Sequence, residues 1–101
     1  MSTMSTLTRV TEVRHLGARC LRVTFSDGLV RELDFAGTLD GVLSSIDDDE
    51  VFGRVALNSA TGTVCWSSGI DLDPDVLHGD EPPASGRAPT VLREYRLQQT
   101  R

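Results

Sequence analysis

The fold is decided by the stretch Cys20-Leu21-Arg22-Val23-Thr24-Phe25-Ser26-Asp27-Gly28. Its apolar residues Leu21, Val23 and Phe25 alternate with more polar ones, a period of two that is typical of a strand with one buried face. The glycine of the Asp27-Gly28 pair tolerates the positive φ of a tight turn, and apolar residues resume directly after it. The stretch therefore predicts a strand followed by a hairpin.

The segments on either side of this stretch extend the sheet. Residues 7–16 interleave apolar and charged positions, and their β-branched content, with Gly17 following, favours a strand with a bulge over a helix. Residues 29–35 form the second arm of the hairpin. Because Arg31, Glu32 and Asp34 interrupt the hydrophobic phase of that arm, we expect an irregular or edge strand there.

A change of period after Gly37 predicts a short helix. Leu39, Val42, Leu43 and Ile46 recur at helical spacing, and the acidic run at residues 47–50 is placed to cap a second helical turn at residues 51–52. Two alternating segments around residues 58–62 then predict a second hairpin, which ends at Trp66. We expect an α+β domain: a small antiparallel sheet built from two hairpins, with one or two short helices packed on it.

Composition places the chain among small single-domain proteins. It has 39% hydrophobic and 25% charged residues, and its length suits one core. Residues 1–7 are polar and carry no basic-then-apolar signal, so we expect a flexible N-terminus and a cytoplasmic protein without a membrane segment. Cys20 and Cys65 fall on predicted strands, which favours free, structural thiols over a disulfide or a metal site.

The charge is distributed unevenly along the chain. The net charge is −5, and residues 26–78 alone contain eleven acids against Arg31 and Arg54. An acidic central region repels a phosphate backbone, which disfavours nucleic acid as the main partner, and an acidic face suits a basic partner better.

The composition shifts again after His78. Residues 79–86 contain two consecutive prolines and no apolar periodicity, so the domain is expected to span residues 8–78 and to be followed by a Pro/Gly-rich linker and tail over 79–101. For residues 90–97, which are apolar and arginine-bearing, we expect either a strand that packs back on the domain or a short amphipathic turn. Because terminal segments are common places for partners to bind, the tail contributes candidate interaction residues, Arg93, Tyr95 and Arg96.

The most distinctive motif is the stretch Cys65-Trp66-Ser67-Ser68-Gly69-Ile70-Asp71-Leu72-Asp73-Pro74-Asp75-Val76-Leu77. Together with Val23-Thr24-Phe25-Ser26-Asp27-Gly28, the Leu33-Asp34 pair, Phe52 and Val55, it resembles the small bacterial family called domain of unknown function 2442, over about residues 8–78. Ser67-Ser68 and His78 depart from the usual family pattern.

The resemblance implies a compact α+β domain on an antiparallel sheet, found alone or joined to a helix-turn-helix domain. Such proteins also look like one half of two-gene modules, which implies an antitoxin-like role. The family supplies no catalytic residues to carry over to this sequence.

The alternating acids Asp71, Asp73 and Asp75 have a calcium-site spacing, but the rest of that motif is missing. Val76 stands where a calcium loop needs glycine, and Pro82 where it needs a bidentate glutamate. The structural alternative is that Asp73-Pro74 begins a helical turn with proline at its first position.

Catalytic patterns are weaker still. His15 and His78 are the only histidines, and neither stands in a recognisable motif with a cysteine or serine nucleophile. Carboxylates at residues 47–50 point apart on a helix, which favours a solvated cap over a metal site. No phosphate-binding glycine loop is present in the sequence.

These observations lead to a non-enzymatic protein-interaction module, the antitoxin-like or regulatory half of a two-protein system, which needs no cofactor. A small protein is the expected partner, with a homodimer as an alternative. The candidate interaction residues are Trp66, Asp71, Asp73, Asp75, Arg93, Tyr95 and Arg96. The second hypothesis is a nucleic-acid-associated regulator that uses Arg9, Arg14 and Arg22 on one sheet face. The third is a metal-dependent enzyme near Asp71.

Overall fold

The computed structural model describes residues 8–80 and 87–97. The predicted flexible N-terminus, 1–7, and the proline-containing part of the predicted linker, 81–86, lie outside the described residues. The elements, in chain order, are β1 (Val10–Gly17), β2 (Cys20–Phe25), β3 (Leu29–Asp34), the 3-10 helix η1 (Gly41–Ile46), α1 (Asp49–Phe52), β4 (Ala56–Asn58), β5 (Thr63–Cys65), β6 (Asp71–Leu72), α2 (Pro74–His78) and β7 (Thr90–Arg96).

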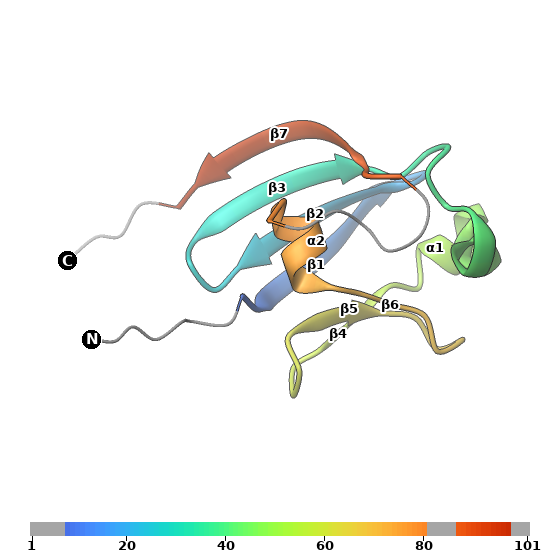
Figure 1. Cartoon of the computed structure of the whole chain (residues 1–101), viewed down its shortest axis with the longest axis horizontal. Coiled ribbons are helices and arrows are strands. Elements are labelled where there is room, and N and C mark those ends of the chain that lie inside the picture. Colours follow the sequence, from blue (N-terminus) through green and yellow to red (C-terminus); the bar gives the residue numbers. More distant parts are fainter. Residues whose placement is uncertain (1–7, 81–86, 98–101) are drawn as a thin grey trace.

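The strands form two antiparallel sheets (Figure 1). The larger sheet has the order β1-β2-β3-β7 and the smaller one β4-β5-β6. The α+β class is confirmed, although the domain is richer in strands than expected, and the two hairpins contribute to separate sheets instead of one. Short strands β4 and β5 do not continue the first sheet; they pack beside β1, where the Val10 N–H donates to the Gly62 carbonyl at 2.8 Å.

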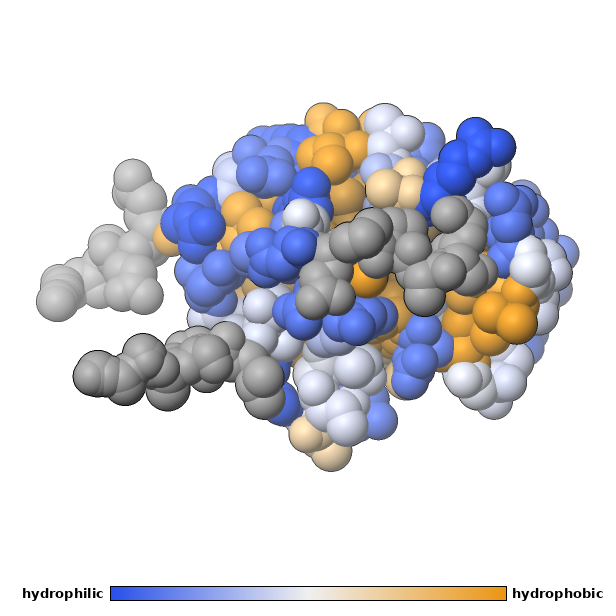
Figure 2. Space-filling view, in the orientation of Figure 1, coloured by the Kyte–Doolittle hydropathy of each residue, from blue (hydrophilic) through white to orange (hydrophobic). Residues whose placement is uncertain are grey.

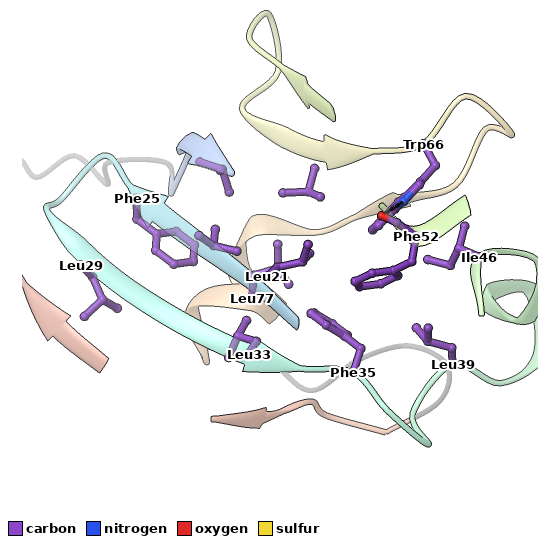
Figure 3. Close-up of a cluster of buried hydrophobic side chains, with 13 residues drawn as sticks. Leu21, Phe25, Leu29, Leu33, Phe35, Leu39, Ile46, Phe52, Trp66 and Leu77 are labelled. Carbon is purple, nitrogen blue, oxygen red and sulfur yellow. Dashed lines mark hydrogen bonds between the residues drawn. The ribbon is translucent and has the colours of Figure 1, made fainter. Parts of the chain in front are cut away.

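The core lies on one face of the four-stranded sheet. In β2, Leu21, Val23 and Phe25 are buried as their alternation predicts, while the residues between them are only half-buried. Leu77 of α2 packs on this face, and Phe52 of α1 lies between Phe35 and Trp66 (Figure 3). One small hydrophobic core therefore holds the sheet, the short helices and the smaller sheet together.

Local sequence signals explain the ends of the short helices. The Asp48 carboxylate accepts the backbone N–H groups of Glu50 and Val51, so it caps α1 as predicted. Asp73 caps α2 in the same way, with Pro74 at the first helical position. Gly79 ends α2 with a φ of 98°, a left-handed conformation that glycine adopts without strain.

Strand β3 is internal, which corrects the expectation of an edge strand. β7 pairs with its outer side, so β3 has a hydrogen-bonded neighbour on each side. The Glu32 side chain, only 14% exposed, pairs with Arg22 of β2 at 3.2 Å and with Arg93 of β7 at 3.9 Å. The charges of Arg31 and Glu32 are thus paired with residues of the neighbouring strands.

Trp66 belongs to the core and provides a test of the packing. Its side chain is 3% exposed and its indole N–H donates to the Phe52 carbonyl at 3.1 Å. We expect Trp66→Ala to lower the free energy of unfolding by about 3–5 kcal/mol, because it leaves a large cavity. Trp66→Phe should cost less, since it keeps an aromatic ring and loses mainly the buried hydrogen bond. Urea denaturation of the three proteins measures the order, and unchanged stability in the alanine variant would contradict this account.

Candidate functional site

The C-terminal strand β7 is attached to the sheet without contributing to its core. It pairs antiparallel with β3 from Leu29↔Arg96 to Asp34↔Thr90, and the Leu97 N–H extends the pairing by donating to the Gly28 carbonyl at 2.8 Å. All seven residues of β7 are exposed. Backbone hydrogen bonds, and not hydrophobic burial, therefore position this strand.

Three ion pairs reinforce the backbone pairing. Glu94 meets Arg31 of β3 at 2.9 Å, Arg93 lies 3.9 Å from Glu32, and Arg96 lies 3.5 Å from the Asp27 carboxylate while also donating to the Asp27 carbonyl at 2.9 Å. The side chain of Arg31 is 13% exposed, so its pair with Glu94 is the least accessible to water. Because exposed ion pairs contribute little to stability, we expect the Arg31–Glu94 pair to matter most of the three.

Exposed apolar side chains gather on this strand. Among the described residues, six large hydrophobic side chains are exposed, and four of them lie at the end of the chain: Val91, Leu92, Tyr95 and Leu97. Figure 2 shows hydrophobic surface at the top of the molecule, where Figure 1 places β7. The Arg93 guanidinium lies 5.0 Å from the centre of the Tyr95 ring, a cation–π distance that orders both side chains.

A charged corner joins the ends of α2, β7 and the β2–β3 turn. The His78 ring has its Nε2 2.8 Å from Asp27 Oδ2 and its Nδ1 3.2 Å from Asp80 Oδ2. The geometry of the Nδ1 contact does not satisfy a hydrogen bond. Phe25 presents its ring edge-on to His78 at 4.8 Å between ring centres. With Arg96 on the same Asp27, this corner fixes the C-terminal end of β7.

The pKa of Asp27 reflects these contacts. Partial burial of the carboxylate opposes ionisation, but the Leu29 N–H, His78 and Arg96 together outweigh it and hold the Asp27 pKa below its ordinary value. The folded protein thus stabilises the ionised form of Asp27.

The three acids of the distinctive motif are placed by structure. Asp73 accepts the Asp75 N–H at 2.9 Å as the cap of α2, Asp71 is exposed at the start of β6, and Asp75 lies in the first turn of the helix. Within residues 8–80 and 87–97, no three His, Cys, Asp or Glu side chains are grouped as a metal site. The motif acts here as the joint between the smaller sheet and α2.

Trp66 presents little of its surface to a partner. A hollow of about 210 Å³ lies beside it, lined also by Val51, Arg54 and Ser67-Ser68. Arg54 at its rim pairs with Glu50 at 3.0 Å, and both side chains are largely exposed.

The predicted arginine face is not a free basic surface. Arg9 donates to the Ser59 carbonyl at 2.7 Å, and Arg22 donates to Glu32 at 3.2 Å. Arg14 stands opposite Arg22 in the β1–β2 register. Two of the three guanidinium groups are thus committed within the protein, which weakens the case for a phosphate-binding patch.

The candidate catalytic groups are also separated. His15 contacts the Ala18 carbonyl at 3.0 Å, and His78 belongs to the charged corner. Both cysteines are free and half-buried. Burial raises the pKa of the Cys20 thiol, with the Asp34 carboxylate adding to the shift, which lowers the thiolate fraction needed for nucleophilic attack.

The structure thus brings together the tail residues Arg93, Tyr95 and Arg96 on one strand and places Trp66, Asp71, Asp73 and Asp75 elsewhere. Sequence reasoning missed the partners Asp27, Arg31 and Glu32. Their charges are opposite in sign to those of the residues that they meet in 93–96, and this complementarity was the signal in the sequence that could have indicated the pairing.

Residues 10–82 match a family described as Protein of unknown function (DUF2442). The chain belongs to this family. No curated protein and no solved structure matches the chain. β7 lies beyond the matched residues, so the DUF2442 segment supplies β1–β6 and α2, and the C-terminal strand is added along its β3 edge. No helix of the described residues is long and apolar enough to cross a membrane.

The charged corner of this DUF2442 domain gives a pH prediction. A carboxylate with a lowered folded-state pKa stabilises the protein above its unfolded pKa, about 3.9, and that contribution is lost as the pH falls through the folded pKa. Asp27→Asn should therefore be less stable than wild type at pH 7, and the difference should shrink in acid. Asp40→Asn is the matched control, since the Asp40 side chain caps nothing. Thermal unfolding from pH 7 to pH 2.5 tests this, and a difference independent of pH would contradict it.

Proposed function

We propose that this DUF2442 chain is a non-enzymatic protein-interaction module and that β7 is its binding strand. One observation carries the proposal: β7 is held by backbone pairing and ion pairs while all seven of its residues are exposed. An outer strand of this kind offers unpaired N–H and C=O groups to an extended segment of another protein. The exposed apolar side chains beside that edge add side-chain contacts.

The orientation of the backbone identifies the available groups. Leu97 directs its N–H to Gly28, and backbone groups alternate direction along a strand. Arg93 and Tyr95 therefore direct their N–H and C=O groups toward β3, and Glu94 and Arg96 direct theirs away from the sheet. An added strand would bond to Glu94 and Arg96.

Two forms of the partner follow from the sequence. In the first, the chain is the regulatory, antitoxin-like half of a two-protein system and β7 receives the other protein. In the second, the partner is another copy of the chain. The non-enzymatic part of the proposal is supported by the separated histidines and the raised pKa of Cys20. The engaged arginines Arg9 and Arg22 support a protein over a nucleic acid.

A proline at position 94 tests whether the outer edge of β7 binds the partner. Glu94→Pro removes an outward N–H while sparing the bonds of its neighbours to β3. Glu94→Ala loses the same ion pair with Arg31 but keeps the N–H, so it is the matched control. We expect tagged wild type and Glu94→Ala to capture a protein from extracts of the source cells, and Glu94→Pro to capture at least about tenfold less, a loss near 1.4 kcal/mol.

Intact-mass measurement after nuclease treatment identifies the captured species. Equal capture by the proline and alanine variants would contradict β7 as the binding strand. Material that disappears with nuclease would instead support the nucleic-acid regulator. Circular dichroism of each variant confirms that the comparison is made between folded proteins.

A further inference from the structure

We propose that a second copy of this chain is the partner that β7 fits, through antiparallel pairing of the two β7 strands about a two-fold axis at Tyr95. The inference rests on the proposed function and names the occupant of the same edge. Such pairing would join the two four-stranded sheets into one continuous eight-stranded sheet.

The two outer strands of the sheet are not equally available. Beside β1 lies the β4–β5 hairpin, which accepts the Val10 N–H at Gly62 and the Arg9 guanidinium at Ser59. Within the described residues, no element occupies the corresponding outer side of β7 in the order β1-β2-β3-β7. An assembly that joined β7 of one copy to β1 of the next would be obstructed. Pairing of β7 with itself uses the open edge twice and closes after two copies.

The position of the axis follows from the regular part of the strand. The β3–β7 pairing has a register shift between Glu32 and Leu33, which leaves Leu92 without a partner residue in β3. The regular run is therefore residues 93–97, and its centre is Tyr95. Bulges disturb pairing locally, so the undisturbed run is the segment suited to a further strand.

Charge complementarity selects the same axis. With the axis at Tyr95, Glu94 of each copy faces Arg96 of the other, which gives two cross-strand pairs of opposite charge. With the axis at Arg93, two guanidinium groups would face each other, and with the axis at Glu94, two carboxylates would. The two Tyr95 residues would form a close, non-hydrogen-bonded pair, because their backbone groups are bonded to β3.

The surroundings of β7 also permit contact between like molecules. The chain carries a net charge of −5, so two copies repel each other over much of their surface. Around β7, however, the three arginines Arg31, Arg93 and Arg96 balance the three acids Asp27, Glu32 and Glu94. An edge whose charges sum to zero does not attract a strongly charged partner. The same edge of a second copy can approach it without net electrostatic repulsion.

A cysteine at the axis is the most direct test. In a close antiparallel pair the two Cα atoms lie about 4.5 Å apart, within the range that a disulfide spans. We expect Tyr95→Cys to form a covalent dimer under mild oxidation, and Val42→Cys, which is 70% exposed on η1, to stay mostly monomeric. Wild type controls for the half-buried Cys20 and Cys65. Equal cross-linking of the two variants on a non-reducing gel would overturn the proposed axis.

A charge exchange separates contacts between copies from contacts within one copy. Glu94→Arg and Arg96→Glu each place like charges across the two-fold axis, and each should weaken the dimer at least about tenfold. The double variant restores opposite charges across the axis, although both ion pairs within the copy, with Arg31 and with Asp27, become pairs of like charge. Recovery of the dimer in the double variant, measured by sedimentation velocity, supports pairing between copies. A double variant that is as weak as the single ones, while circular dichroism shows its sheet intact, would overturn it.

The outcomes distinguish this inference from the proposed function. A wild-type dimer at about 100 μM, where a micromolar complex is nearly complete, supports the inference if Glu94→Pro weakens it at least about tenfold more than Glu94→Ala, which loses the same ion pairs but keeps the N–H. A monomeric wild type whose capture of another protein is still lost in Glu94→Pro overturns the homodimer and leaves the proposed function standing. A monomer whose capture is the same in all variants contradicts both.

Discussion

The arrangement of the outer strands depends on the contacts of one side chain, that of Arg31. This arginine lies on the core face of β3 with its side chain 13% exposed, and a charge in such a place needs partners. It donates to the Leu77 carbonyl at 2.7 Å and meets Glu94 at 2.9 Å, so one guanidinium joins β3, α2 and β7. Gly79 makes room for it: a Cβ there would lie 2.9 Å from the guanidinium. The end of α2 and the docking of β7 therefore meet at the same side chain.

The sequence predicted elements whose signals are local. The alternation in β2, the Asp27-Gly28 turn, the Asp48 cap and the Asp73-Pro74 helix start each depend on residues within a few positions of one another, and each appears in the structure. Trp66, a candidate interaction residue from the sequence, is buried: its indole packs against Phe52, fourteen residues away, and donates to the Phe52 carbonyl.

The internal place of β3 and the second sheet could not be predicted in this way, because they depend on distant pairing. β7 meets β3 across about sixty positions and none of its residues is buried, so the sequence of residues 90–97 left both a docked strand and a short amphipathic turn open. The charged residues of β3 suggested an edge strand, because their partners Arg93 and Glu94 lie far away in the sequence. For the candidate site, the composition of the tail was enough to name candidate residues there. Which edge of β7 is open, and which of its backbone groups point outward, could be read only from the structure.

The match to the DUF2442 family ends before β7, and this boundary has a physical meaning. Within the matched residues β3 would be the open edge, with Arg31 and Glu32 exposed along it. β7 covers those charges and moves the open edge outward to a strand with exposed apolar side chains. Because backbone bonds and ion pairs hold β7 while hydrophobic burial does not, it ranks among the less stable parts of the domain. A strand added on its outer side would give β7 two paired neighbours. The proposed binding surface therefore coincides with the weakly held element, and a partner that filled the edge would stabilise β7.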